Sequence, residues 1–239
     1  MAAPVWIAEP GSGRRVHRTS VTASAYQGGV RARTKAAPWQ DLDLVLAASS
    51  YAADAHCADV RKATTIPYLS HLWAVAALAL EHGADDEQVA AALLHDVVED
   101  HGGKQRLAEV RRRFGKGVAD LVEALSDSVV DTSSGEEKAS WCERKAAYLA
   151  HLAEADGRVA LVSACDKLHN ARAILADLRS TGAEVWDRFN AKDPHLQLWY
   201  YEALTETLKP KVPEPLGEEL ERTVAAIRAE VERPDGEAS

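Results

Sequence analysis

Histidine and carboxylate side chains gather in two neighbouring stretches of the chain. The first, 71-HLWAVAALAL-80, begins with His71, and the second, 91-AALLHDVVED-100, contains the adjacent pair His95 and Asp96. Imidazole nitrogens and carboxylate oxygens bind divalent ions such as Mn²⁺, Fe²⁺, Zn²⁺ or Mg²⁺. A mixed set of this kind leaves coordination positions open for water and substrate. The spacing therefore predicts a catalytic metal site of a hydrolase.

Three acidic residues share one face of the second stretch. Glu99 and Asp100 follow Asp96 at the helical spacings i+3 and i+4. Clustered carboxylates repel one another unless a cation joins them. We therefore predict that Glu99 and Asp100 lie beside the metal, where they orient or deprotonate its bound water.

A fourth ligand is predicted on a distant helix. The segment 158-RVALVSACDKLHNARAILADL-178 has an apolar helical pattern that Asp166 interrupts, and a carboxylate within such a run needs a partner. Asp166 completes a predicted ligand set with His71, His95 and Asp96. Asn170, one turn further on, is expected to hydrogen-bond the substrate.

Each of these features has a simpler interpretation when it is taken alone. Asp166 could form a buried ion pair with Arg61 or Arg172, and the acidic pair at 99–100 could be a solvated helix end. The ordered spacing on three helices favours the metal site over these interpretations. The other histidines are expected at the surface or in packing positions: His17, His56, His82, His101, His151, His169 and His195.

Composition places these residues in a globular protein. The chain has 239 residues, 46% of them apolar, which is enough for one well-buried domain. Its net charge of −9 argues against a general nucleic-acid binder but allows a small anionic substrate. No apolar stretch approaches the roughly 18 to 20 residues that cross a bilayer. Cys57, Cys142 and Cys165 have no C-x-x-C spacing and are expected to be reduced and mostly buried, which favours a cytoplasmic location.

Apolar residues recur with helical spacing through the middle of the chain, so an all-α domain is predicted over residues 39–210. Gly83 is a stop signal, and Asp85 with Gln88 makes a capping box, so the two motif helices are expected to form a hairpin. The predicted helices cover 41–57, 69–82, 87–100, 104–114, 117–127, 140–155, 158–178 and 194–208.

The two ends of the chain are expected to be separate from this domain. Residues 1–38 hold six basic residues and one acid and have no apolar periodicity, which predicts a flexible basic tail. The alternatives for this tail are an organelle presequence and a segment that docks on RNA or membrane surfaces. Residues 211–239 are expected to contain a proline-rich linker, a polar helix from about 216 to 231 and a disordered end.

An ordered series of motifs resembles the HD-domain metal-dependent phosphohydrolases. The resemblance is greatest to the hydrolase part of the RelA/SpoT-type enzymes and to the small alarmone hydrolases related to metazoan SpoT homologue 1. It covers about residues 47–208. Its motifs are 61-RK-62, 68-YLSH-71, 90-AAALLHDVVED-100, 114-FG-115, 118-VADLVEALSD-127, 143-ERK-145 and 165-CDKLHNAR-172.

The resemblance implies a helical bundle in which the four predicted ligands hold Mn²⁺ or another divalent ion. It also implies that Glu99 and Asp100 activate water. The implied reaction is hydrolysis of the 3′-pyrophosphate of guanosine tetra- or pentaphosphate (ppGpp or pppGpp), the alarmones of the stringent response, to GDP or GTP and pyrophosphate. The implied substrate contacts surround the nucleotide: Arg61, Lys62, Tyr68, Arg144, Lys145, Lys167, Asn170 and Arg172.

The chain departs from the family pattern at three places. His101 stands where the family usually has threonine, 163-SAC-165 stands where it usually has Lys-Leu-Ala, and the connection at 128–142 is longer than usual. Two alternatives therefore stay open. One is a phosphatase acting on NADPH, an adenosine alarmone or a nucleoside monophosphate, and the other is a nucleotide sensor without turnover. No synthetase domain, specific nucleic-acid partner or membrane partner is expected, and the sequence leaves the oligomeric state open.

Overall fold

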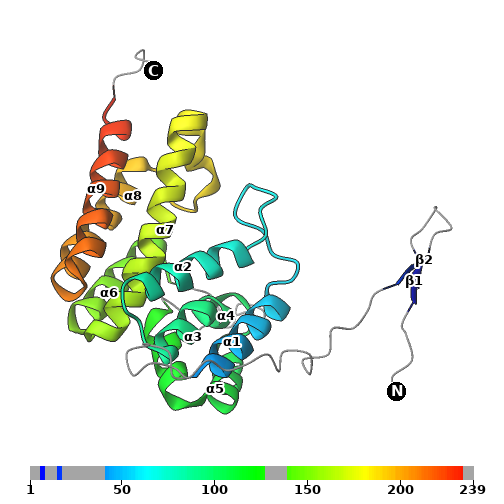
Figure 1. Cartoon of the computed structure of the whole chain (residues 1–239). Coiled ribbons are helices and arrows are strands. Elements are labelled where there is room, and N and C mark those ends of the chain that lie inside the picture. Colours follow the sequence, from blue (N-terminus) through cyan, green and yellow to red (C-terminus); the bar gives the residue numbers. More distant parts are fainter. Residues whose placement is uncertain (1–5, 9–14, 18–40, 127–138, 234–239) are drawn as a thin grey trace. The chain divides into compact units, whose positions relative to one another are not determined.

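The computed structural model describes residues 41–126 and 139–233 in full and the backbone of two short strands near the N-terminus. Helices make up the described body of the chain, which confirms the predicted all-α fold (Figure 1). They are α1 (Leu42–Ala55), α2 (Leu69–Glu81), α3 (Asp86–Leu94), α4 (Val97–Asp100), α5 (Gly103–Leu125), α6 (Trp141–Glu154), α7 (Gly157–Thr181), α8 (Pro194–Leu208) and α9 (Glu214–Val231). The 3₁₀ turns η3 (Gly182–Arg188) and η4 (Lys209–Lys211) follow α7 and α8.

Residues 1–37 and 38–239 form two separate compact units. In the first unit, β1 (Trp6–Ala8) pairs antiparallel with β2 (Arg15–His17), an element that the sequence pattern does not predict. The rest of the predicted basic tail lies outside the described residues. Most of the long connection at 128–142 also lies outside them.

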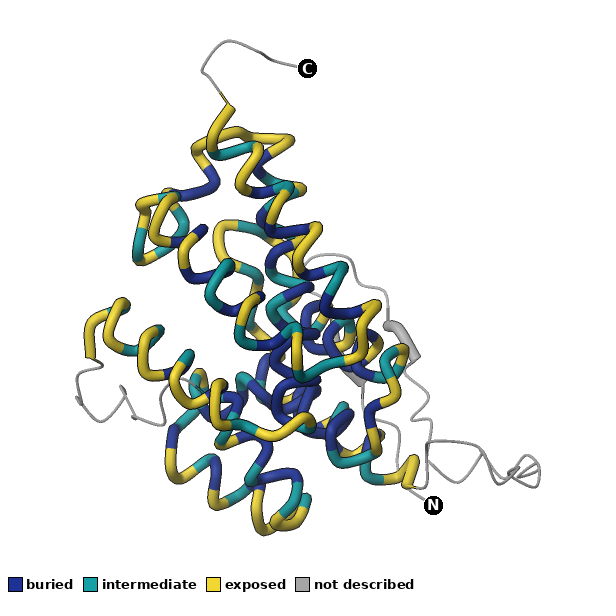
Figure 2. The backbone as a smooth tube through the Cα atoms, turned by 90° about the vertical axis from the view of Figure 1, so that its left-hand side faces the viewer, coloured by how far each residue is buried: buried dark blue, intermediate teal, exposed yellow. Residues whose placement is uncertain are grey.

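Helix α3 lies at the centre of the second unit. Seven consecutive residues, Gln88 to Leu94, are buried, and α1, α2, α5 and α7 all pack against this helix. The small side chains at 90–92 allow these neighbours to approach closely. The buried parts of the chain accordingly gather where the helices meet (Figure 2). Because His95 directly follows α3, the core itself positions this predicted ligand.

The N-termini of α3 and α7 are tied together. Asp85 and Gln88 form the predicted capping box at the start of α3. Arg158, in the first turn of α7, donates hydrogen bonds to Asp85 at 2.9 Å and to Glu87 at 2.8 Å. The side-chain amide of Gln88 donates to the Arg158 carbonyl at 3.1 Å. These contacts hold the first turns of the two helices side by side.

One of the predicted helices is interrupted in the structure. The helix predicted at 87–100 is broken after Leu94 into α3 and α4. Nδ1 of His95 lies 2.8 Å from the carbonyl oxygen of Ala92, the oxygen that the backbone N–H of Asp96 takes in a regular helix. The break predicted between the helices at 104–114 and 117–127 is confirmed, because α5 has a kink at Gly115, whose non-helical φ of 86° suits glycine.

Helix α9 packs against α7 and α8, in the same compact unit as the other helices. Leu216, Leu220, Val224 and Ile227 form its buried face. Within the segment predicted as a linker, Nζ of Lys211 donates hydrogen bonds to carbonyl oxygens at the end of α6, at 3.0 Å and 2.9 Å. A lysine in this position neutralises the negative end of a helix. The C-terminal segment thus contributes to the fold.

We expect Leu220→Ala to lower the free energy of unfolding by about 2–5 kcal/mol, because it leaves a cavity between α9 and its neighbours. Leu220 is completely buried. Arg222→Ala, on the exposed side of the same helix, is the control and should change stability by less than about 0.5 kcal/mol. Urea denaturation followed by circular dichroism measures both variants. Equal, small effects would mean that α9 does not pack on the body in solution.

The three cysteines are free, but the expected burial is wrong for two of them. Cys57 and Cys142 are exposed, and Cys165 is buried in α7. Burial, followed by the charge of Asp166, raises the pKa of the Cys165 thiol to about 12, so this thiol is unreactive in the folded protein. In the described residues, no helix combines the length and the apolar character that crossing a membrane requires.

Candidate metal centre

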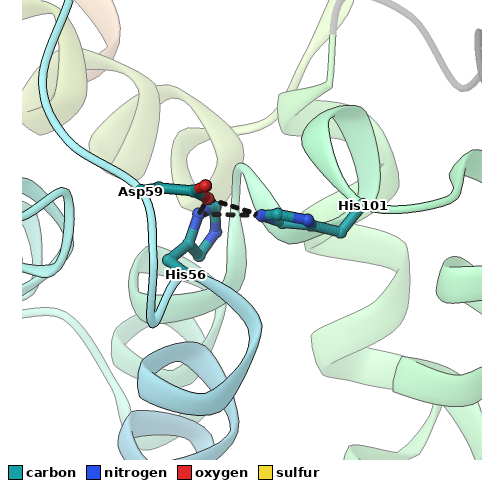
Figure 3. Close-up of side chains that lie close together, drawn as sticks. All are labelled: His56, Asp59 and His101. Carbon is teal, nitrogen blue, oxygen red and sulfur yellow. Dashed lines mark hydrogen bonds and ion pairs between the residues drawn. The ribbon is translucent and has the colours of Figure 1, made fainter.

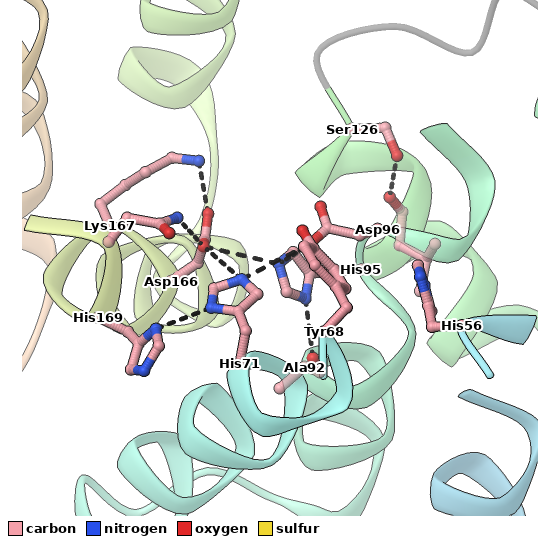
Figure 4. Close-up of polar contacts among 12 residues, drawn as sticks. His56, Tyr68, His71, Ala92, His95, Asp96, Ser126, Asp166, Lys167 and His169 are labelled. Carbon is pink, nitrogen blue, oxygen red and sulfur yellow. Dashed lines mark hydrogen bonds and ion pairs between the residues drawn. The ribbon is translucent and has the colours of Figure 1, made fainter. Parts of the chain in front are cut away.

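The structure brings the four predicted ligands together from α2, the turn after α3, and α7 (Figure 4). Nε2 of His95 lies 2.9 Å from Oδ2 of Asp96 and 3.6 Å from Oδ1 of Asp166. Nε2 of His71 lies 3.6 Å and 3.2 Å from the same two oxygens. Ligand atoms bound to one ion at about 2.0–2.2 Å lie roughly 3 Å apart, so these distances fit a divalent metal ion.

Hydrogen bonds outside the ligand set orient the imidazole of His95. Its Nδ1 donates to the carbonyl of Ala92, which leaves the lone pair on Nε2, facing the other ligands. This Nε2 is buried and has no aligned hydrogen-bond partner among the described residues. Burial disfavours the imidazolium ion, but Asp96 and Asp166 outweigh it and raise the pKa of His95 well above its ordinary value. The position that this proton would occupy therefore also suits a metal ion.

The ring of His71 has a similar support, which the sequence did not reveal. Its Nδ1 lies 2.8 Å from Nδ1 of His169. Burial, followed by the neighbouring His71 and Arg61, lowers the pKa of His169 to about 4, so this ring is neutral at pH 7 and can accept a hydrogen bond from Nδ1–H of His71. Nε2 of His71 is then free to bind a metal. His169 is therefore part of the site, although it was expected at the surface or in a packing position.

The two carboxylates remain anionic within the core. Burial by itself favours their neutral forms, but His95 holds the pKa of Asp96 well below its usual range, and Lys167 and His71 do the same for Asp166. The hydroxyl of Tyr68 donates to Oδ2 of Asp96 at 2.6 Å. Both carboxylates are thus ready to bind a cation.

Asp166 is held by two donors on its own helix. Nζ of Lys167 lies 2.5 Å from Oδ2, and the side-chain amide of Asn170 donates to Oδ1 at 2.6 Å. The amide oxygen of Asn170 in turn accepts a hydrogen bond from Arg61 at 2.9 Å. Asn170 therefore links the metal centre to a basic side chain, in addition to its predicted contact with a substrate.

A cavity of about 930 Å³ opens beside the metal centre. Glu99 and Asp100 line it, and Nη1 of Arg144 lies 4.0 Å from Oε1 of Glu99. Arg172 does not line the cavity; it is exposed and pairs with Glu219. The other predicted substrate contacts all line the cavity: Arg61, Lys62, Tyr68, Arg144, Lys145, Lys167 and Asn170.

The cavity wall contains aromatic residues that the sequence analysis missed. Lys145 and Lys167 carry ammonium groups 5.1 Å and 5.4 Å from the ring centres of Tyr200 and Tyr148. The hydroxyl of Tyr148 lies 3.1 Å from the hydroxyl of the buried Ser163, one of the departures from the family pattern. The buried Tyr200 hydroxyl makes no hydrogen bond within the described part of the chain. No local pattern distinguishes these tyrosines from core residues.

Comparisons with known proteins identify the family of the chain. The model of the HD domain family matches residues 48–193. A probable chloroplastic GTP diphosphokinase of Arabidopsis thaliana is 36% identical over 135 residues, which are 55% of this chain and 19% of that protein. A probable guanosine-3′,5′-bis(diphosphate) 3′-pyrophosphohydrolase of Synechocystis sp. is 32% identical over 178 residues, 72% of this chain and 22% of that protein. The chain thus spans about a fifth of the length of these curated relatives.

A solved structure has the same fold over most of the chain. It belongs to a metazoan orthologue of SpoT that hydrolyses ppGpp, and it superposes with a TM-score of 0.62 at 25% sequence identity. The match covers 78% of this chain and 96% of the other. The similarity therefore extends over most of the chain and nearly all of the other protein.

Proposed function

The chain belongs to the HD domain family, and from this membership we propose that it hydrolyses the 3′-pyrophosphate of ppGpp and pppGpp. The products are GDP or GTP and pyrophosphate, and the proposal covers degradation of the alarmone, not its synthesis. The observation that carries it is the buried Nε2 of His95, which faces three further ligands beside a cavity lined with basic side chains.

The charge of the cavity supports a polyphosphate substrate. Six arginines and lysines line it in a chain whose net charge is −9: Arg61, Lys62, Arg144, Lys145, Lys167 and Arg188. Guanidinium and ammonium groups form strong charge-assisted hydrogen bonds with phosphate oxygens. The aromatic rings of Tyr68 and Tyr200 provide apolar surface in the same wall, which suits a nucleoside.

We propose Mn²⁺ as the ion, since a ligand set of two imidazoles and two carboxylates suits it. When bound, the ion supplies Lewis-acid activation of water and of the phosphoryl group. The side chains have separate tasks. Glu99 accepts the proton of the attacking water. Asp100, the next residue along the chain, lines the same cavity and assists Glu99. Lys167 and Asn170 keep Asp166 in position.

Incubation of the full chain with ppGpp and Mn²⁺ tests the proposal directly. We expect release of GDP and pyrophosphate in equal amounts and no release after treatment with a chelator. NADPH, an adenosine alarmone and a nucleoside monophosphate, assayed in parallel, separate the proposed substrate from other phosphorylated nucleotides. The proposal fails if ppGpp stays intact, and ppGpp that binds without turnover would instead identify a sensor.

We expect Arg61→Ala to raise the KM for ppGpp by roughly 10- to 100-fold, the value of a charge-assisted hydrogen bond of about 1.5–3 kcal/mol. Arg61 lines the cavity and contacts Asn170, so kcat should fall less than kcat/KM. Arg172→Ala is the matched control, because Arg172 lies outside the cavity and pairs with Glu219. Steady-state kinetics measure both variants. An equal rise in KM for both would contradict the assignment of Arg61.

We also propose that the protein acts in the cytoplasm on a small nucleotide. The acidic net charge of −9 disfavours general binding to nucleic acid, so the basic residues of the cavity are expected to serve the substrate. The three free thiols are consistent with a reducing compartment.

A further inference from the structure

A second group of metal-ligating side chains lies apart from the four residues of the metal centre (Figure 3). It consists of His56, Asp59 and His101, and we refer to it as the His–Asp–His cluster. His56 follows α1, Asp59 lies in the next loop, and His101 follows α4. Oδ2 of Asp59 lies 2.8 Å from Nδ1 of His56 and 2.7 Å from Nε2 of His101. The two ring nitrogens are 3.2 Å apart.

Only one arrangement of protons satisfies these three atoms. Both ring nitrogens must carry a proton toward Asp59, so two N–H groups converge on one carboxylate oxygen while their nitrogens are only 3.2 Å apart. If Nδ1 of His56 is unprotonated, its lone pair faces a carboxylate oxygen at 2.8 Å. If Nε2 of His101 is unprotonated, the same conflict arises at 2.7 Å. A single cation among the three lone pairs is the alternative to these two converging protons.

The spacing of the three atoms is close to that around a metal ion. Ligands in tetrahedral coordination with bonds of about 2.0–2.1 Å lie about 3.3 Å apart, so a small outward movement of each side chain admits an ion. Packing holds the rings in place. The buried ring of His56 stacks on Tyr68 with centres 5.0 Å apart, and it meets His101 edge-on at 4.5 Å.

The cluster has one open side. The side chains of Asp59 and His101 are 38% and 26% exposed and line the same cavity as the metal centre, whereas His56 is completely enclosed. Three protein ligands with an open position are the arrangement of zinc sites that bind a further molecule. Tyr68, which stacks on His56, also donates to Asp96, so a single side chain separates this cluster from the metal centre.

We propose that the His–Asp–His cluster binds a second divalent transition-metal ion, for which Zn²⁺ suits the two nitrogens and one oxygen best. The open position of this ion faces the cavity, where a water molecule or a phosphate oxygen of a bound nucleotide completes the coordination. Metal binding here does not depend on which nucleotide is the substrate, and only the contact with a phosphate rests on the proposed function. His101, a departure from the family pattern, thus becomes a ligand.

The test is the number of Zn²⁺ ions that each chain binds. Metal-free full-length protein is dialysed against Zn²⁺ alone, and bound metal is measured by inductively coupled plasma mass spectrometry. We expect about two equivalents for the unchanged chain and about one for His101→Thr or Asp59→Asn, because each removes a ligand of the cluster only. His95→Ala should also retain about one, and the double variant His95→Ala, His101→Thr none. His195→Ala, which removes an exposed histidine, is the matched control and should retain about two.

Substitution with Co²⁺ provides a second readout. Visible absorption that reports four-coordinate Co²⁺ should remain in His95→Ala and disappear in the double variant, while circular dichroism shows that each variant is folded. The proposal is overturned if the unchanged chain binds one equivalent that His95→Ala abolishes. It is equally overturned if His101→Thr and Asp59→Asn bind as much Zn²⁺ as the unchanged chain, since the cluster would then be a purely hydrogen-bonded one.

Discussion

Replacing His95 by alanine should remove the ion of the metal centre and lower the hydrolysis of ppGpp by about 10³-fold or more. The loss of a supporting residue outside the ligand set already costs about 10- to 100-fold, and His95 is itself a proposed ligand. Asp96→Ala should behave in the same way, because it removes an oxygen ligand at the same place. Bound Mn²⁺ and the initial rate at limiting Mn²⁺ measure the two effects together.

The control for this result is His195→Ala, since His195 is an exposed histidine at the start of α8. It should leave metal content and rate unchanged. His95→Ala removes the imidazole that lies between the negative charges of Asp96 and Asp166, which lowers stability. Circular dichroism therefore checks that the variant is folded. A folded His95→Ala protein that retained the Mn²⁺ stoichiometry and rate of the unchanged chain would remove His95 from the ligand set.

Glu99→Gln should retain the metal and lower kcat by about 10²- to 10⁴-fold, the usual contribution of a general base. The substitution keeps the shape of the side chain and removes only its ability to take a proton. Glu99 lines the cavity and is not among the residues that converge on the metal, so metal affinity should change little. Single-turnover rates and Mn²⁺ titration separate the two quantities.

Asp100→Asn is the informative companion to Glu99→Gln. If Glu99→Gln turned over normally and Asp100→Asn did not, the proton acceptor would be Asp100, which lines the same cavity. Glu206→Gln, on the exposed side of α8, is the control for loss of one carboxylate from the chain. It should leave both kcat and metal affinity unchanged.

Much of the fold follows from local patterns in the sequence. Apolar spacing located the helices, and the capping box at Asp85 and Gln88 placed the start of α3 correctly. The position of α9 was harder to predict, because a proline-rich stretch resembles a linker whether or not the helix after it packs on the body. The break after Leu94 depends on one side-chain contact, from His95 to a backbone carbonyl, that no periodicity reveals.

The candidate site could also be predicted only in part. The four predicted ligands could be found because their types and spacing are unusual for packing residues, and the structure brings them together. His169 was missed, since it contacts His71 across a separation of 98 residues and resembles any other helical histidine. The His–Asp–His cluster was missed for the same reason, because His56 and His101 are 45 residues apart and meet only in the folded chain. Arg172 was predicted as a substrate contact from its position in a motif, but it does not line the cavity.

The hydrogen bonds between the first turns of α3 and α7 make the metal centre sensitive to the number of residues in each helix. His95 comes nine residues after the first residue of α3, and Asp166 comes nine residues after the first residue of α7. The distance along each helix from its first turn, where Arg158 joins the two helices, to its ligand is therefore the same. Deleting or inserting one residue in either segment would turn its ligand by about 100° and shift it by about 1.5 Å. A change in the number of residues within 86–95 or 157–166 should consequently separate the predicted ligands even where it leaves every ligand residue in place.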